Sequence, residues 1–164
     1  MFNFSVNRFL ILIMSVCSLG VSSCQTIDLY EKNVPIPGHR WESRFRPQFH
    51  FTIKDTSSPY QLYIVLRHNE KYSWNNLWVN LEGQMPGQAK QVFKLELPLA
   101  TNEKGWLGAA MDDLYEHRIP LVLDPEKFNF NKAGEYHFSI QHIMREDPLE
   151  NVMNVGLRIE KKPK

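Results

Sequence analysis

Residues 136–141 read Tyr-His-Phe-Ser-Ile-Gln, so apolar and polar side chains alternate along the segment. A period of two is typical of a β-strand that buries one face. The same alternation recurs on both sides of this segment, over residues 45–53, 62–67, 77–82, 93–99, 119–123 and 153–159. Several short alternating segments in one chain predict an antiparallel all-β protein.

Turn-forming residues separate these segments, as in Asp-Thr-Ser-Ser-Pro at 55–59 and Glu-Gly-Gln-Met-Pro-Gly at 82–87. Segments with a helical period are missing between the strands, which argues against a parallel sheet. The sequence therefore predicts an antiparallel two-sheet β-sandwich, Ig-like or jelly-roll-like. At most one short helix is expected, over Leu107–Glu116, as a crossover between strands.

The first residues of the 164-residue chain have the order of a secretory signal. Arg8 precedes an apolar run from Phe9 to Leu19, and small residues follow at Ser22 and Ser23. The run is too short for a comfortable membrane span. We expect residues 1–23 to be a lipoprotein signal peptide, 24–40 a lipidated tether or edge strand, and 41–164 the β-sandwich domain.

The segment Val21-Ser22-Ser23-Cys24 is similar to the bacterial lipobox. That similarity implies cleavage before Cys24, diacylglycerol on its sulfur and a further acyl chain, such as palmitate, on its amine. Two or more acyl chains hold a protein stably at a membrane. Gln25 follows in place of Asp, and no acidic cluster comes next. By analogy with lipoprotein sorting in diderm bacteria, this favours the periplasmic face of the outer membrane.

Charge and cysteine content exclude several classes of function. Lys and Arg number 19 against 18 Asp and Glu, without a basic run. Such a balance is poor for binding a phosphate backbone, so we expect no nucleic-acid partner. The two cysteines, Cys17 and Cys24, both lie at the start. The body of the chain therefore has no disulfide framework, cysteine zinc site or thiol nucleophile.

No catalytic signature stands out. The chain has no Gly-x-Ser-x-Gly, glycine-rich phosphate loop or His-Glu-x-x-His. The six histidines lack a tight ligand spacing, and His142 shares the apolar face of its segment, as expected for a core or rim residue. Asp112 and Asp113 diverge as neighbours and predict a solvated face rather than a hydrolase pair. We expect a non-enzymatic protein with no metal or cofactor.

Four tryptophans lie outside the regularly spaced apolar positions of the alternating segments. They form the candidate interaction surface: Trp41, Trp74, Trp78 and Trp106. Aromatic side chains of this kind anchor protein partners or stack on sugar rings. The alternative is that other segments cover them, because large aromatic side chains are often mostly buried. Two functions remain open: a tethered protein-interaction module and a glycan-binding module.

Three segments together with the lipobox carry a family resemblance: residues 60–69 (Tyr-Gln-Leu-Tyr-Ile-Val-Leu-Arg-His-Asn), 132–145 (Lys-Ala-Gly-Glu-Tyr-His-Phe-Ser-Ile-Gln-His-Ile-Met-Arg) and 154–160 (Asn-Val-Gly-Leu-Arg-Ile-Glu). The chain resembles the gliding-motility lipoproteins of the GldH family of Bacteroidota. The resemblance implies an accessory cell-envelope lipoprotein that supports gliding and the associated secretion apparatus, with envelope proteins as partners. Only Cys24, as the lipidated residue, carries over by position.

Overall fold

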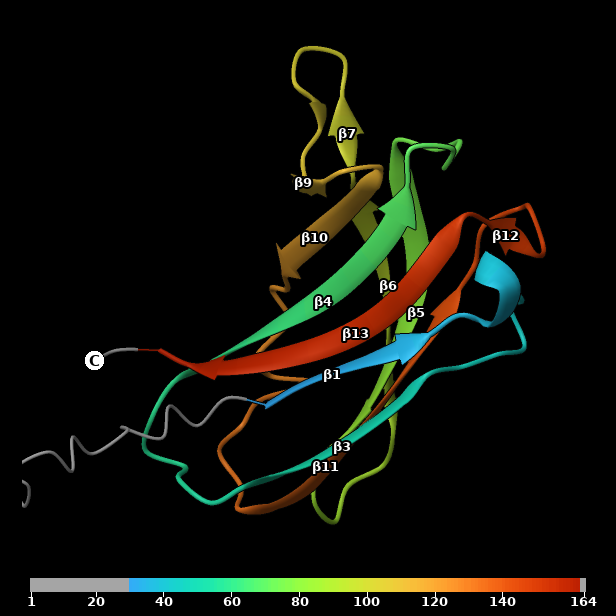
Figure 1. The fold of residues 1–164 in the computed structure, drawn as a ribbon. Coiled ribbons are helices and arrows are strands. Elements are labelled where there is room, and N and C mark those ends of the chain that lie inside the picture. Colours follow the sequence, from blue (N-terminus) through green and yellow to red (C-terminus); the bar gives the residue numbers. More distant parts are fainter. Residues whose placement is uncertain (1–29, 163–164) are drawn as a thin grey trace, which may run out of the picture.

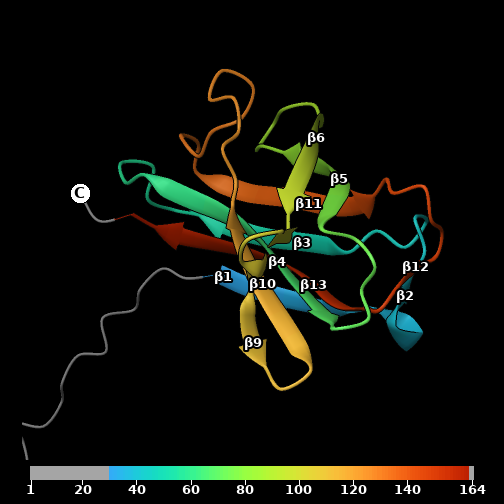
Figure 2. The same ribbon diagram turned by 90° about the horizontal axis from the view of Figure 1, so that it is seen from above.

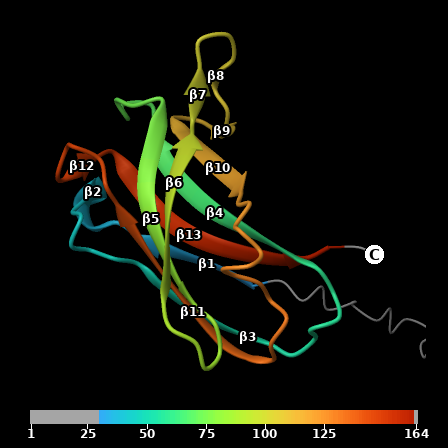
Figure 3. The same ribbon diagram turned by 180° about the vertical axis from the view of Figure 1, so that it is seen from behind.

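Two antiparallel sheets pack face to face (Figures 1 and 2). The structure is a computed structural model, and it describes residues 30–162. The five-stranded sheet has the spatial order β1 (Tyr30–Pro35), β13 (Val152–Lys161), β4 (Tyr60–Asn69), β10 (Leu114–Pro120) and β9 (Ala109–Met111). The four-stranded sheet, seen from behind in Figure 3, has the order β3 (Gln48–Ile53), β11 (Gly134–His142), β5 (Asn76–Gln84) and β6 (Gln91–Pro98). The predicted all-β sandwich is confirmed.

Short elements complete the molecule. Strand β2 (Arg40–Trp41) pairs with β12 (Leu149–Glu150), directly after the 3-10 turn η1 (Pro37–His39). Strands β7 (Ala100–Thr101) and β8 (Gly105–Trp106) form a hairpin that projects beyond the two sheets (Figure 1).

The core lies between the two sheets and follows the alternation in the sequence. In β11, Tyr136, Phe138 and Ile140 are at most 3% exposed, whereas the residues between them lie on the outer face. In β3, Phe49, Phe51 and Ile53 are buried in the same way. Burial of one such side chain stabilises the folded state by about 1.5–3 kcal/mol, so the alternation sets which face of each strand is inside.

The helix predicted over Leu107–Glu116 is wrong. This segment instead follows β8 and contains β9 and the start of β10, which form a hairpin whose turn contains Asp112 with a φ of 55°. A residue in the left-handed region cannot continue a right-handed helix. Pairing of β10 with β4, from Leu114 opposite Asn69 to Pro120 opposite Tyr63, outweighs the local helical preference of the Ala-Ala-Met sequence.

Strand β1 forms an edge of the five-stranded sheet, where Tyr30 lies opposite Ile159 and Pro35 opposite Asn154. We call the end of the sandwich at which Tyr30 lies the proximal end. The opposite end, towards which β1 runs to Pro35, is the distal end. The signal peptide and Cys24 lie outside the described residues, so their assignment stays a prediction. Among residues 30–162, no helix has the length and apolar character needed to cross a bilayer.

Candidate functional site

A groove with two of the four candidate tryptophans opens on the outer face of the four-stranded sheet, at the distal end. Its lining residues come from the start of β5, from β6 and from the segment after β11: Trp74, Asn76, Trp78, Lys94, Ile143, Met144 and Arg145. We call it the aromatic groove. Trp78 reaches this face because its neighbours in β5, Leu77 and Val79, point into the core and are fully buried.

The indole rings of the groove are held in place and yet accessible. Trp74 is 41% exposed, and its Nε1 donates a hydrogen bond of 2.9 Å to Oε2 of Glu146. The ammonium of Lys94 lies 5.2 Å from the ring centroid of Trp78, within the range of a cation–π contact. Apolar surface rimmed by fixed polar groups is the usual composition of a contact site for a partner.

The other two tryptophans do not belong to this surface. Trp41 is fully buried, its Nε1 donates to the carbonyl of Phe45 at 2.8 Å, and its ring packs edge-on against His142. The prediction that Trp41 contributes to an interaction surface is therefore wrong, because the β2–β12 pair places it in the core. Trp106 is half-buried in a different cluster and packs against His68 with 4.4 Å between ring centroids.

A buried histidine pair lies beneath Trp106. Nε2 of His68 and Nε2 of His117 are 2.9 Å apart, and Nδ1 of His68 lies 2.7 Å from the carbonyl oxygen of Asn69. The carbonyl can only accept, so His68 carries its proton on Nδ1 and its Nε2 accepts from His117. Burial lowers the pKa of both rings, to about 4 for His117, where proximity to His68 adds to the effect. Both histidines are therefore neutral at pH 7.

His142 lies in the core, at 0% exposure, as its place on the apolar face of the segment predicts. Its Nε2 is 3.6 Å from Oδ1 of Asp147. Burial lowers the pKa of His142, and the Asp147 carboxylate acts in the opposite direction. Hydrogen bonds from the hydroxyl and amide of Ser43 hold the pKa of Asp147 below its usual range.

Asp112, Asp113 and the nearby Glu116 do not form a pair of carboxyl groups suited to glycoside hydrolysis. Asp112 and Asp113 are exposed in the turn between β9 and β10. Glu116 is already engaged in ion pairs, at 2.5 Å with Arg67 and 2.9 Å with Arg118. A glycosidase needs two carboxyl groups facing each other across a sugar, and these three residues do not provide that arrangement.

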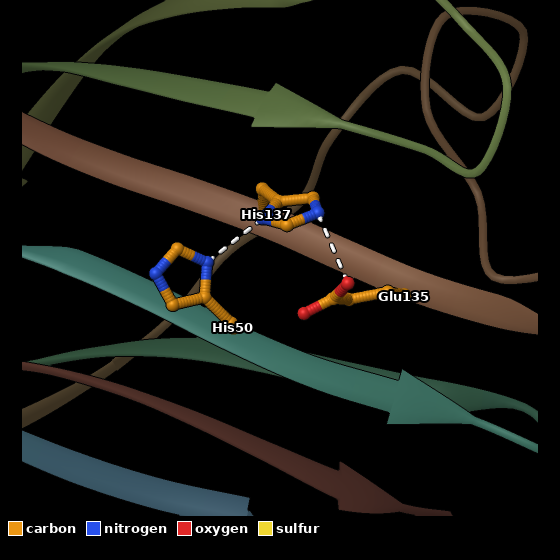
Figure 4. Close-up of side chains that lie close together, drawn as sticks. All are labelled: His50, Glu135 and His137. Carbon is orange, nitrogen blue, oxygen red and sulfur yellow. Dashed lines mark hydrogen bonds and ion pairs between the residues drawn. The ribbon is translucent and has the colours of Figure 1, made fainter.

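A second histidine cluster lies on the outer face of the four-stranded sheet (Figure 4). His50 of β3 is directly opposite His137 of β11, and their Nδ1 atoms are 2.8 Å apart. Glu135, two residues before His137 on the same face, has its Oε2 at 3.6 Å from Nε2 of His137. Spacing along the chain missed this cluster, since 87 residues separate the two histidines. Only the pairing register of β3 with β11 could have revealed it.

The molecule is thus an all-β sandwich with an aromatic groove and a histidine cluster on the outer face of its four-stranded sheet. The sequence model of the GldH lipoprotein family matches residues 28–159. The chain belongs to this family of gliding-motility lipoproteins.

Two relatives agree with this assignment. The chain is 30% identical over 148 residues to the gliding motility lipoprotein GldH homolog of Christiangramia forsetii, covering 85% of this chain and 88% of that protein. It is 26% identical over 157 residues to the gliding motility lipoprotein GldH of Flavobacterium johnsoniae, covering 92% of this chain and 95% of that protein.

Proposed function

We propose that this protein is a lipid-anchored, non-enzymatic interaction component of the gliding-motility machinery and its associated secretion apparatus. In this proposal, acyl chains on Cys24 hold it at the periplasmic face of the outer membrane. The aromatic groove, with Trp74 and Trp78, contacts another protein of the envelope. Membership of the GldH lipoprotein family supports the association with motility.

The single observation that carries the interaction role is the position of the aromatic groove. The lipobox cysteine precedes β1, and β1 enters the fold at the proximal end, where Tyr30 pairs with Ile159. The groove lies at the distal end, between the start of β5 and the segment that follows β11. A tether at one end and an accessible aromatic site at the other would present that site away from the anchoring membrane.

Protein contact fits the groove better than stacking on a glycan. A glycan-binding face would be expected to line up several exposed aromatic rings, whereas Trp41 is buried and Trp106 packs elsewhere. Two tryptophans, a methionine and two cations in one depression instead have the composition of a protein–protein contact, where Trp, Met and Arg are enriched.

The proposal is tested by replacing the lipidated residue. Cys24→Ser is expected to move the protein from the membrane fraction to the soluble fraction, because the thiol that accepts diacylglycerol is gone. Cys17→Ser, in the apolar core of the signal, is the matched control and should leave the protein in the membrane fraction. Crosslinking in intact envelopes should then recover motility or secretion proteins with the parent chain and not with Cys24→Ser. Equal recovery with both, or membrane retention of Cys24→Ser, would contradict the proposal.

Trp74→Ala tests the groove itself. Truncating an exposed aromatic anchor is expected to weaken partner capture about tenfold or more, with a change in unfolding free energy below about 1 kcal/mol. Trp41→Ala is the contrasting variant. Its ring is fully buried, so truncation should lower the free energy of unfolding by about 3–5 kcal/mol. Unchanged crosslinking yield for Trp74→Ala would exclude the groove as the contact site.

A further inference from the structure

The His50–Glu135–His137 cluster has the donor set of a transition-metal site. One ligand atom from each residue lies within 4.8 Å of the other two. Two imidazole nitrogens with one carboxylate oxygen suit zinc and the neighbouring divalent transition metals, whereas magnesium and calcium prefer all-oxygen surroundings. This set arises from two strands that are far apart in the sequence (Figure 4).

The distance between the two nitrogens matches shared coordination. Nitrogens bound to one cation at about 2.0–2.1 Å lie about 2.9 Å apart at a right angle and about 3.4 Å apart at the tetrahedral angle. The Nδ1 atoms of His50 and His137 are 2.8 Å apart, and their rings are inclined at 69°. Rotation of the two rings about their side-chain torsions would turn both Nδ1 lone pairs towards one ion. Glu135 is exposed, and its carboxylate, which now lies 3.6 Å from Nε2 of His137, turns towards the Nδ1 atoms when the metal binds.

Without a metal, the two rings share one proton between their Nδ1 atoms, since one must donate and the other accept. Metal binding needs both Nδ1 atoms as acceptors. The ring that carries its proton on Nδ1 can transfer that proton to Nε2 through water. This is a change of tautomer, and the net charge of the ring stays the same. Both histidines lie on the open side of the sheet, where water has access.

The backbone that carries the ligands is already ordered. Strands β3 and β11 pair continuously from Ile53 opposite Gly134 to Gln48 opposite Ser139. Beneath the cluster, Phe49, Phe51 and Phe138 are buried in the core and fix both strands from the inner side. Ligands that stand on paired strands lose little freedom on binding, which favours affinity.

Local charge also permits a cation here. The cluster borders a shallow hollow that includes Lys90 and Glu82. The ammonium of Lys90 lies 2.7 Å from Oε1 of Glu82, so that pair is neutral overall, and the Glu135 carboxylate adds a negative charge next to His137. We infer that His50, His137 and Glu135 bind one divalent transition-metal ion, with zinc as the first example, on the same face of the sheet as the aromatic groove.

Three protein ligands leave at least one coordination position open. Water fills such a position in the isolated protein, and a donor side chain of a docked partner can replace that water. The site would therefore strengthen contact on this face when metal is present. This inference stands apart from the proposed lipid anchor and groove, because it depends only on the β3–β11 register.

The inference is tested by titrating the full chain, purified in detergent without a polyhistidine tag, with Zn²⁺ in a calorimeter. We expect one Zn²⁺ per chain in the parent and at least tenfold weaker binding in His50→Gln and in His137→Gln. His39→Gln is the matched control, since His39 is an exposed histidine of η1 and should leave binding unchanged. Far-UV circular dichroism confirms that each variant is folded.

A second readout separates specific binding from adsorption. Zn²⁺ should raise the Tm of the parent and of His39→Gln but not of His50→Gln, and Mg²⁺ should raise none of them, because a ligand that binds only the folded state stabilises it. Absence of Zn²⁺ binding by the parent would overturn the inference. Equal Zn²⁺ affinity in parent, His50→Gln and His137→Gln would overturn it as well.

Discussion

Leu81→Asp is expected to leave the domain unfolded at neutral pH. Leu81 is fully buried in the centre of β5, opposite Ile140 of β11 and Phe93 of β6. Loss of the leucine side chain alone costs about 2–5 kcal/mol, and an unpaired carboxylate in an apolar core costs several kcal/mol more. The sum reaches the whole stability of a typical domain, about 5–15 kcal/mol. Near-UV circular dichroism and urea titration would report the loss of fixed tertiary structure.

Val122→Asp provides the matched control for this variant. It introduces the same aspartate in place of an aliphatic side chain, but Val122 is 92% exposed. The free energy of unfolding should change by no more than about 0.5 kcal/mol. If Leu81→Asp were to unfold at the same urea concentration as Val122→Asp, this result would contradict the burial of Leu81 between β5 and the five-stranded sheet.

Acid is expected to destabilise the domain between about pH 6.5 and pH 4, through the buried histidines. The folded-state pKa of His117 is about 4, below the value of about 6.5 for an unfolded histidine, so the unfolded chain binds more protons in this range. Stability is therefore complete above about pH 6.5 and falls as the pH approaches 4. At about 1.4 kcal/mol per pKa unit, His117 alone accounts for a loss of about 3 kcal/mol. Urea titrations at several pH values would measure it.

His117→Gln isolates this contribution. A glutamine amide can still donate to Nε2 of His68 but does not titrate, so the decline in unfolding free energy with acid should become shallower. It should not vanish, because burial also lowers the pKa of His68 and of His142. Val122→Gln, which introduces the same amide at an exposed position without a titratable group, is the control and should keep the slope of the parent. A parent whose stability stays constant from pH 7 to pH 4.5 would contradict the neutral, buried state of the pair.

The sequence predicted the strands well because their burial is one-sided. In β3 and β11 every second side chain is in the core, and this alternation is visible without any tertiary information. The sequence-based prediction of a helix failed for Leu107–Glu116, where pairing with β4 overrides the local helical preference. The alternation over residues 93–99 also overstates the burial of β6. Leu95 lies on the inner face but is only half-buried, because β6 is an edge strand.

The candidate site was predictable only in part. Trp74 and Trp78 are four residues apart around the start of β5, and both line the aromatic groove. Trp41 offers the same local signal of an aromatic residue outside an alternating stripe, yet the β2–β12 pair carries it into the core. Exposure of a tryptophan depends on what packs over it, and that covering segment comes from elsewhere in the chain.

The strand periodicity, the similarity of residues 21–24 to a lipobox and the family resemblance, which the GldH family assignment confirms, could all be recognised from residues close together along the chain. Which side chains from distant segments come into contact depends on the tertiary structure. The 2.8 Å contact of His50 with His137 and the 2.9 Å contact of His68 with His117 both arise from strand register. Register is set by the burial of whole sheet faces and by the turns between strands, so it emerges only when the complete sandwich has formed.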